Sequence, residues 1–280
     1  MGSKAKLFSR NNKSKNLNSL QDFGLLFVIL FGGVILSFAS DVFATGLNFR
    51  NVALASTVVA VMAIGQTFVI LVAGIDLSVG AMLALSSVLS VGFTIKQGLP
   101  VGVSIVLALL VGLFVGLING LSVTVLKIPP LIATLASMSI VRGFAYIYSG
   151  GMNITPTPDI FSKFQEATIF GVPLVIIFTL VLGIIAHITL TKTSFGRQVF
   201  STGGNALASQ LAGIRVNRVI IYCYMLSGFC AAIAGILLSA RLDAGAATAG
   251  MGYELTVISA CVIGGVSLFG GEGKIGAVFL

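Results

Sequence analysis

Few residues in this chain could carry acid–base, nucleophilic or metal chemistry. Its 280 residues include only eight acidic residues and one histidine, His187. The three cysteines, Cys223, Cys230 and Cys261, lie in apolar runs without metal-ligand spacing and imply no disulfide framework. No G-x-S-x-G nucleophile elbow is present. We therefore expect no catalytic residue and no metal site. The carboxylates within the apolar runs are also too few for a proton relay.

One glycine-rich stretch, GGEGKIG (270–276), has the spacing of a nucleotide-binding turn. In a dinucleotide-binding fold, G-x-G-x-x-G joins a strand to a helix within a βαβ unit. No such unit surrounds this stretch, and Lys274 is followed by Ile275 rather than by the Ser or Thr of a phosphate loop. We interpret the stretch as a turn between packed helices and expect no bound cofactor.

The acidic residue that most needs an explanation is Asp76, in the stretch GIDLSVG (74–80) between two apolar runs. Acidic groups at membrane depth are costly and often functional. We favour a capping role, in which Asp76 is the N-cap residue of the third predicted span. In the alternative, Gly74, Asp76, Ser78 and Gly80 form a gate or hinge near a translocation path. GGEGKIGA faintly repeats GIDLSVGA, as in transporters built from internal repeats.

The composition indicates the elements that must position these residues. The chain is 57% hydrophobic and 9% charged, whereas soluble domains carry roughly a quarter charged residues. We predict an all-α, polytopic membrane protein. The formal net charge of +8 resides mainly in the N-terminal tail and in loops, so it indicates membrane orientation and not binding to nucleic acid.

The apolar runs predict about eight complete transmembrane helices and a truncated ninth, since a spanning helix needs about 20 apolar residues. Residues 1–21 form a basic tail, and residues 22–280 form one transmembrane domain. The expected spans are 23–43, 51–73, 79–95, 101–126, 131–149, 172–190, 219–240 and 254–269, with a last run that begins at Ile275 and stops at Leu280.

The positive-inside rule orients these spans with the N-terminus in the cytoplasm. The inner segments then hold eleven of the sixteen basic residues and the outer segments four, while Arg142 lies within a span and must find a partner there. This orientation places the polar segment Thr191–Arg218 in the cytoplasm and residues 150–171 outside.

The segment Thr191–Arg218 contains a predicted short helix, Ala206–Ala212. Asn205 can cap its first turn, and Gly213 can adopt the left-handed conformation that ends it. So short a helix needs something to pack against. It is either a docking element on the cytoplasmic face or a loop that connects two spans, and the residues alone leave both interpretations open.

A glycine pattern marks one face of the span 101–126. Gly112, Gly116 and Gly120 recur every four residues, a spacing typical of close helix packing in membranes. Asn119 lies beside this face and can hydrogen-bond a neighbouring helix or line a path. We favour packing as the role of these four residues.

Four stretches together resemble the ribose-type permease subunits of bacterial ABC sugar importers, within the branched-chain-amino-acid/monosaccharide permease superfamily. The resemblance covers about residues 45–280, and family members usually continue through two more spans. The matching stretches are VMAIGQTFVILVAGIDLSVG (61–80), GLINGLSVTVLKIPPLIATLASMSIVRG (116–143), TSFGRQVFSTGGNALASQLAGIRV (193–216) and VIGGVSLFGGEGKIGAVFL (262–280).

This resemblance implies a subunit of the bacterial cytoplasmic membrane that carries a monosaccharide, by default ribose. Two permease chains would form the pathway, a separate cytoplasmic ATPase would bind ATP, and a periplasmic or lipid-anchored binding protein would deliver the sugar. The residues that fall on the implied ATPase-coupling segment are Gly196, Arg197, Gly203, Gly204, Asn205 and Gly213.

Other functions stay open at this point. The chain could be a truncated, non-functional or regulatory paralogue, or a carrier or channel that works without an ATPase. A membrane-embedded hydrolase that uses His187 has no support from residue spacing. Xylose, galactose, inositol or a nucleoside are alternatives to ribose.

Overall fold

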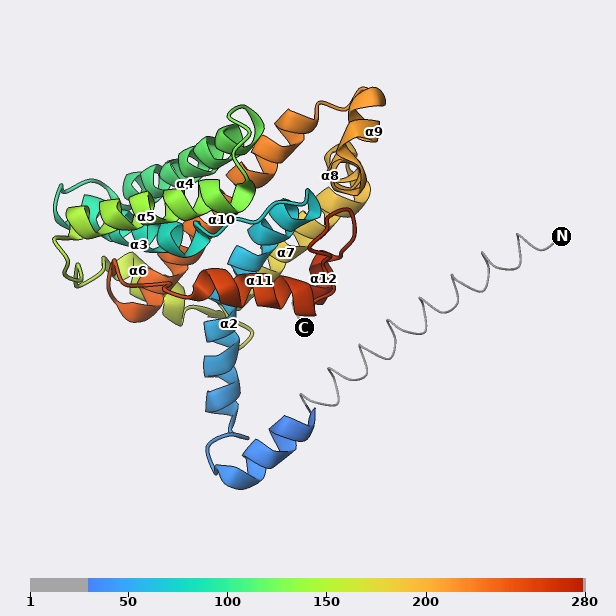
Figure 1. Cartoon of the computed structure of the whole chain (residues 1–280). Coiled ribbons are helices and arrows are strands. Elements are labelled where there is room, and N and C mark those ends of the chain that lie inside the picture. The colour runs from blue at the N-terminus through green and yellow to red at the C-terminus, as the bar shows by residue number, and fades with distance from the viewer. Residues whose placement is uncertain (1–29, 279–280) are drawn as a thin grey trace. The chain divides into compact units, whose positions relative to one another are not determined.

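A computed structural model describes residues 30–278 (Figure 1). The predicted basic tail, residues 1–21, and the first part of the predicted span 23–43 lie outside the described residues. The chain divides into two compact units, Met1–Ala53 and Leu54–Leu280. We describe each unit by itself.

The first unit contains an apolar helix at Leu30–Ala39 and the start of α2 (Gly46–Leu71). Between them, the Asn48 side chain donates a 2.9 Å hydrogen bond to the Phe43 carbonyl, and the Phe43 and Phe49 rings meet edge to face. These contacts close the turn that leads into α2.

The second unit is helical apart from one small hairpin (Figure 1). In addition to α2, four helices are long and apolar enough to cross a membrane. Helix α3 is shorter and almost entirely buried. The bounds of these elements are α3 (Val79–Ile95), α4 (Val101–Thr124), α5 (Pro130–Ser149), α7 (Leu174–Lys192) and α10 (Val216–Leu242).

The coarse prediction of a helical membrane protein is therefore confirmed, but the count of eight spans plus a ninth is not. Five described helices qualify as candidate spans. The expected span 254–269 is α11 (Tyr253–Ile263), whose 11 residues reach only about 16 Å at 1.5 Å per residue. Its helix ends early because the Gly-rich stretch after Ile263 turns the chain. The last run forms α12 (Ile275–Val278) within the described residues.

At the centre of the second unit, glycines allow the backbones of α4 and α10 to touch directly. A Cβ atom at Gly116 would overlap the Tyr224 carbonyl oxygen, and one at Gly120 would lie 2.8 Å from the Ile221 Cα. Gly112 and Gly228 approach each other in the same way. The α4 and α10 backbones therefore lie in direct contact, and α3 packs against both.

Two parts of the polar segments are more ordered than we expected. Residues 150–171 were predicted only as a polar loop, but they contain α6 (Asp159–Glu166) and strand β1 (Thr168–Ile169), which pairs antiparallel with β2 (Val172–Pro173). Thr168 lies opposite Pro173 in this hairpin. Helix α6 has only eight residues, fewer than the window of about 11–18 residues in which a helical pattern can be recognised from sequence.

The segment 191–218 contains two helices, α8 (Ser194–Gly204) and α9 (Ala206–Leu211). The predicted short helix is thus confirmed as α9: the Asn205 Oδ1 accepts a 2.9 Å hydrogen bond from the Ala208 N–H, and Gly213 has a left-handed φ of 84°. Helix α8 was not predicted. In Figure 1 both helices lie at one end of the second unit, and α6 lies toward the other.

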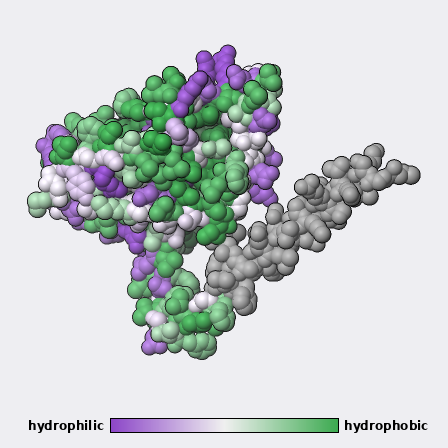
Figure 2. Space-filling model, viewed as in Figure 1, coloured by the Kyte–Doolittle hydropathy of each residue, from purple (hydrophilic) through white to green (hydrophobic). Residues whose placement is uncertain are grey.

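Hydrophobic residues cover much of the face of this unit that Figure 2 shows, with hydrophilic residues gathered toward its ends. Exposed apolar side chains lie along α4 and α7, among them Phe114, Leu180 and Ile184. Such a surface needs an apolar environment, so the chain is a multi-pass membrane protein.

Candidate functional site

The break between α2 and α3 is the most polar region of the buried core. Helix α2 ends at Leu71, and Ala73 adopts a left-handed φ of 59°, a conformation that costs a residue with a side chain roughly 1–2 kcal/mol. Residues 72–78 then run without regular structure to α3. Irregular backbone inside a membrane protein is tolerated only where other groups satisfy its polar atoms.

The carboxylate of Asp76 is completely buried and accepts three hydrogen bonds. Oδ1 accepts from the Ser78 N–H at 2.9 Å and from the Ser78 hydroxyl at 2.6 Å, and Oδ2 accepts from the Ser227 hydroxyl of α10 at 2.8 Å. Asn119 of α4 extends the network, because its Nδ2 donates to the Ser78 Oγ at 2.9 Å. The carboxylate therefore joins the break to α10, and α4 is linked to it through Ser78.

The backbone on either side of Asp76 is held as well. The Gln66 side-chain amide of α2 lies 3.2 Å from both the backbone N and O of Asp76, in the orientation in which it donates to one and accepts from the other. The Ile75 carbonyl accepts from the Thr134 hydroxyl of α5 at 3.3 Å and from the Tyr224 hydroxyl of α10 at 3.4 Å. We call Gln66, Asp76, Ser78, Asn119 and Ser227 the Asp76 network.

The geometry corrects the capping interpretation that we favoured. Ser78 occupies the N-cap position of α3 and makes no side-chain capping bond. Asp76 instead binds the N–H of that N-cap residue, two positions on, and reaches across to α10. The short Asp side chain closes a local turn more easily than it reaches the first helical turn. Its neighbour Gly74 is also tightly packed, since a Cβ there would lie 2.7 Å from the Tyr224 hydroxyl.

A second polar cluster lies beside the first turn of α3. The Arg142 guanidinium of α5 donates to the Ala247 carbonyl at 2.8 Å and to the Ala249 carbonyl at 2.6 Å. These are the membrane-depth partners that the sequence could not identify. The Glu254 carboxylate packs against Gly80, and its Oε2 is buried without a hydrogen-bond partner among the described residues.

Segment α8 contacts the break directly. A Cβ atom at Gly203 would overlap the Leu71 carbonyl oxygen, so only a glycine fits there without movement. The same carbonyl accepts a 2.9 Å hydrogen bond from the Gly271 N–H. The end of α2, the end of α8 and the turn at Gly270–Gly271 therefore converge, five residues before Asp76.

Of the other residues predicted for the coupling segment, some pack against neighbouring backbone and some are exposed. Gly196 packs tightly against the Leu190 backbone at the corner between α7 and α8, and its N–H bonds the Thr193 hydroxyl at 3.2 Å. Arg197 is exposed, and Gly204 has open space around it. The α9 surface also exposes two large apolar side chains, Leu207 and Leu211.

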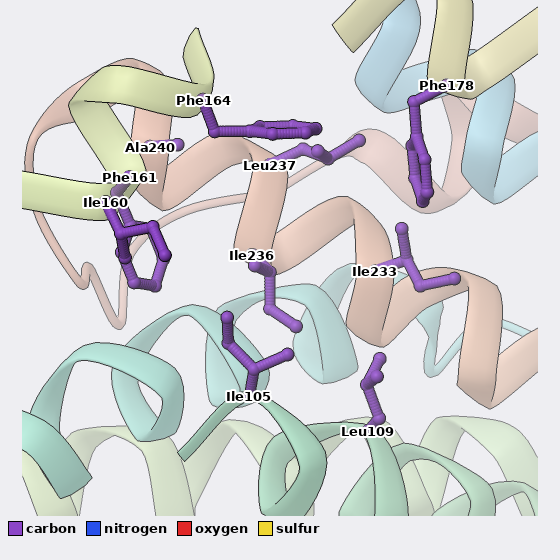
Figure 3. A pocket seen from close by; sticks show the side chains of 10 residues that line it. All are labelled: Ile105, Leu109, Ile160, Phe161, Phe164, Phe178, Ile233, Ile236, Leu237 and Ala240. Atoms are coloured by element: carbon purple, nitrogen blue, oxygen red, sulfur yellow. The ribbon is translucent and has the colours of Figure 1, made fainter. Parts of the chain in front are cut away.

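An apolar pocket of about 260 Å³ lies between α4, α6, α7 and α10 (Figure 3). A sugar site needs hydrogen-bonding side chains, and this pocket has none. Its lining consists of Ile105, Leu109, Ile160, Phe161, Phe164, Phe178, Ile233, Ile236, Leu237 and Ala240. The pocket is therefore unsuited to a polar substrate.

The arrangement defines a helical membrane protein in which a buried polar break contacts a surface helix pair. Residues 48–273 match the model of a family described as the branched-chain amino acid transport system / permease component. The chain belongs to this family of permease components.

Curated relatives agree with this assignment. The chain is 43% identical over 252 residues to the ribose import permease protein of Bacillus subtilis, a match that covers 89% of this chain and 77% of the relative. It is 44% identical over 237 residues to the L-arabinose transport system permease protein of Escherichia coli (84% and 72%) and 33% identical over 255 residues to the D-allose transport system permease protein of the same organism (91% and 77%). No solved structure matches the chain.

Three members of the two polar clusters were not predicted from the sequence. Gln66, Ser227 and Glu254 all lie in or beside apolar helices, and only their polarity distinguishes them. A systematic search for polar residues inside the apolar runs could have found Gln66 and Ser227. Nothing in the sequence indicates that they meet at Asp76.

Proposed function

We propose that this chain is the permease subunit of an ATP-driven sugar importer, and that it couples to a separate ATPase through α8 and α9. Its family and its relatives support this function. The observation that carries the coupling is the contact between Gly203 of α8 and the Leu71 carbonyl at the end of α2. The subunit itself is not an enzyme.

Movement of α8 and α9 would be transmitted to the break between α2 and α3 by a direct contact between backbone atoms. Gly203 and Leu71 meet without intervening side chains, and such a contact cannot absorb movement by changing a rotamer. Closure of the ATPase would push α9 and α8, displace the end of α2 and shift the segment that carries Asp76. The spans would then rock, and the sugar would pass from an outward-facing to an inward-facing cavity.

The proposed partners follow from this scheme. A cytoplasmic ABC ATPase would dock on α9, where Leu207 and Leu211 are exposed beside the basic residues Arg215 and Arg218. A periplasmic or lipid-anchored sugar-binding protein would dock on the opposite side, and a second copy of the chain would complete the pathway. The chain would lie in the bacterial inner membrane with its N-terminus in the cytoplasm, as the distribution of Lys and Arg indicates.

The substrate class is a monosaccharide. Two relatives are named for the pentoses ribose and arabinose and one for the hexose allose, so ribose is the first sugar to test. Arg142 and Glu254 are candidate sugar contacts, since charged groups at membrane depth commonly mark substrate paths.

The test is reconstitution of the chain with its ATPase and its binding protein, followed by measurement of ATP hydrolysis with each loaded sugar. Stimulation by the sugar-loaded binding protein is expected. Gly204→Trp should remove stimulation while leaving the fold intact, because a Cβ at Gly204 would meet nothing within 4 Å and the indole would project toward the ATPase.

Gly33→Trp is the matched control, since it adds the same bulk in a helix far from α8 in sequence and also has open space. Normal stimulation in Gly204→Trp would contradict docking at this surface. Sugar uptake into vesicles that contain the chain without any ATPase would instead favour the stand-alone carrier.

A further inference from the structure

The hairpin between α6 and α7 has an unusual tip. Its two turn residues, Phe170 and Gly171, have φ values of 51° and 80°. Two left-handed residues are the signature of a type I′ turn, which favours Asn, Asp or Gly at the first position. A phenylalanine in this conformation is strained and uncommon. Phe170 is nevertheless fully exposed, with a relative exposure of 102%, so packing against the other described residues does not compensate for the strain.

The residues around Phe170 are apolar too. Ile169 and Val172 are exposed at 47% and 42%, and the hairpin sequence TIFGVP (168–173) carries no charge. An uncharged, apolar tip exposed to water would be an unfavourable arrangement. The strain and the exposure together indicate that this side chain is buried against something outside the chain.

The position of the hairpin identifies what that is. The Leu174 N–H donates a 2.8 Å hydrogen bond to the Ala167 carbonyl, which ties the hairpin to the first turn of α7. Helix α7 is a candidate membrane span with an exposed apolar surface that includes Leu180 and Ile184. The tip lies only four residues before the start of this span, so the exposed apolar hairpin stands at the end of a helix whose own apolar side chains are exposed for contact with lipid.

We propose that this hairpin is a membrane anchor, with Phe170 inserted into the lipid interface at the end of α7 opposite to α8. Aromatic and apolar side chains at the interface fix the depth of the segment that carries them. The 19 residues of α7 span about 28 Å, and the far end continues through Thr193 into α8. With one end held in the interface, movement of α8 tilts α7 and does not slide it through the membrane.

The chain contains no tryptophan, so Phe170→Trp makes a single-tryptophan probe of the full chain. We would reconstitute this variant in liposomes of phosphatidylethanolamine and phosphatidylglycerol, with and without brominated acyl chains. Insertion predicts a blue-shifted emission that brominated lipid quenches and aqueous iodide does not. Glu166→Trp, at an exposed position of the polar helix α6, should show red-shifted emission that iodide quenches.

Emission from Phe170→Trp that resembles the Glu166→Trp control would overturn the proposal. So would emission that ignores brominated lipid but shifts when the binding protein is added or when the chain is diluted within the membrane, since either result identifies a protein as the occupant.

A second variant separates anchoring from folding. Asn suits the left-handed turn position better than Phe does, so Phe170→Asn should leave the fold unchanged or stabilise it if the tip has no occupant. If Phe170 is an anchor, Phe170→Asn in liposomes should unfold at a lower temperature than the parent chain. An unchanged or higher unfolding temperature would contradict anchoring.

Discussion

Two stretches of this chain look alike in sequence and lie in opposite environments. GIDLSVG (74–80) and GGEGKIG (270–276) each carry an acidic residue at the same offset. Asp76 is fully buried, and its side chain accepts hydrogen bonds from two segments. Glu272 is exposed, and its backbone carbonyl accepts a hydrogen bond from the Ser267 N–H. The similarity therefore predicts a turn in each place but not a shared role.

The two stretches are nevertheless connected. The Gly271 N–H bonds the Leu71 carbonyl at 2.9 Å, and a Cβ at Gly270 would lie 2.9 Å from the Ala73 N. One stretch thus contains the buried acid, and the other supports the end of the helix that precedes it. The chemistry of each stretch therefore depends on the elements that pack around it.

The largest expected effect is at the buried acid. Asp76→Ala leaves the Ser78 and Ser227 hydroxyls without their acceptor, and a buried donor left without a partner costs about 1–3 kcal/mol. We expect a loss of roughly 3 kcal/mol in unfolding free energy, against less than about 0.5 kcal/mol for Glu272→Ala at the exposed site. Denaturant unfolding of the reconstituted chain measures both.

Asp76→Asn separates hydrogen bonding from charge, since its amide oxygen still accepts from Ser78. We expect most of the stability to return. Equal unfolding free energies for Asp76→Ala and Glu272→Ala would erase the distinction between the two stretches.

The next effect concerns the contact that joins the stretches. Gly203→Ala places a Cβ against the Leu71 carbonyl, which requires backbone movement, and such overpacking costs about 1–3 kcal/mol. Gly204→Ala meets nothing within 4 Å and should cost far less. Thermal unfolding of the two variants side by side tests this, and similar unfolding temperatures would show that α8 does not press on α2.

The smallest effect is expected at a third carboxylate, which is exposed but paired. Hydrogen bonds from the hydroxyl and the N–H of Thr157 hold the pKa of Asp243 below its usual value. Because the folded-state pKa is lowered, the pairing contributes stability above the ordinary Asp pKa of about 3.9 and loses it as the pH falls through the folded value.

Asp243→Asn suits the left-handed φ of 50° at this position and cannot titrate. The parent chain should therefore be slightly more stable than Asp243→Asn at pH 7, and this lead should begin to shrink as the pH falls below about 4. Unfolding midpoints measured from pH 7 to pH 3 provide the test. A lead that is constant across this range would contradict the assigned pairing.

Helix bounds could be predicted where the residues of a single helix and its flanks determine them. The bounds of α3 were predicted to the residue, and those of α4, α5 and α7 within two residues, because long apolar runs end at Lys, Pro or Gly. The cap at Asn205 was predicted for the same local reason. Helix α6 and the hairpin could not be predicted, since eight residues are too few to distinguish a helix from a loop by pattern and the hairpin lacks a typical Asn-Gly turn.

For the candidate site, some of the residues could be predicted from the sequence but their contacts could not. Asp76, Ser78 and Asn119 stood out as polar residues beside or within apolar runs, but their meeting with Ser227 depends on how α4 and α10 pack on α3. The contact of Gly203 with Leu71 is likewise a property of three-dimensional packing. No local pattern encodes either contact.

The burial of α3 sets a condition on how the chain is made. Helix α3 carries Ser86, Ser87 and Ser90 and is shielded in the finished protein by α4 and α10. During synthesis α10 emerges only after residues 96–215, so α3 enters the membrane before α10 can cover it and before Ser227 can donate to Asp76. Insertion and final assembly are therefore separate events, and the interval between them is when membrane proteases and chaperones can recognise an incomplete chain.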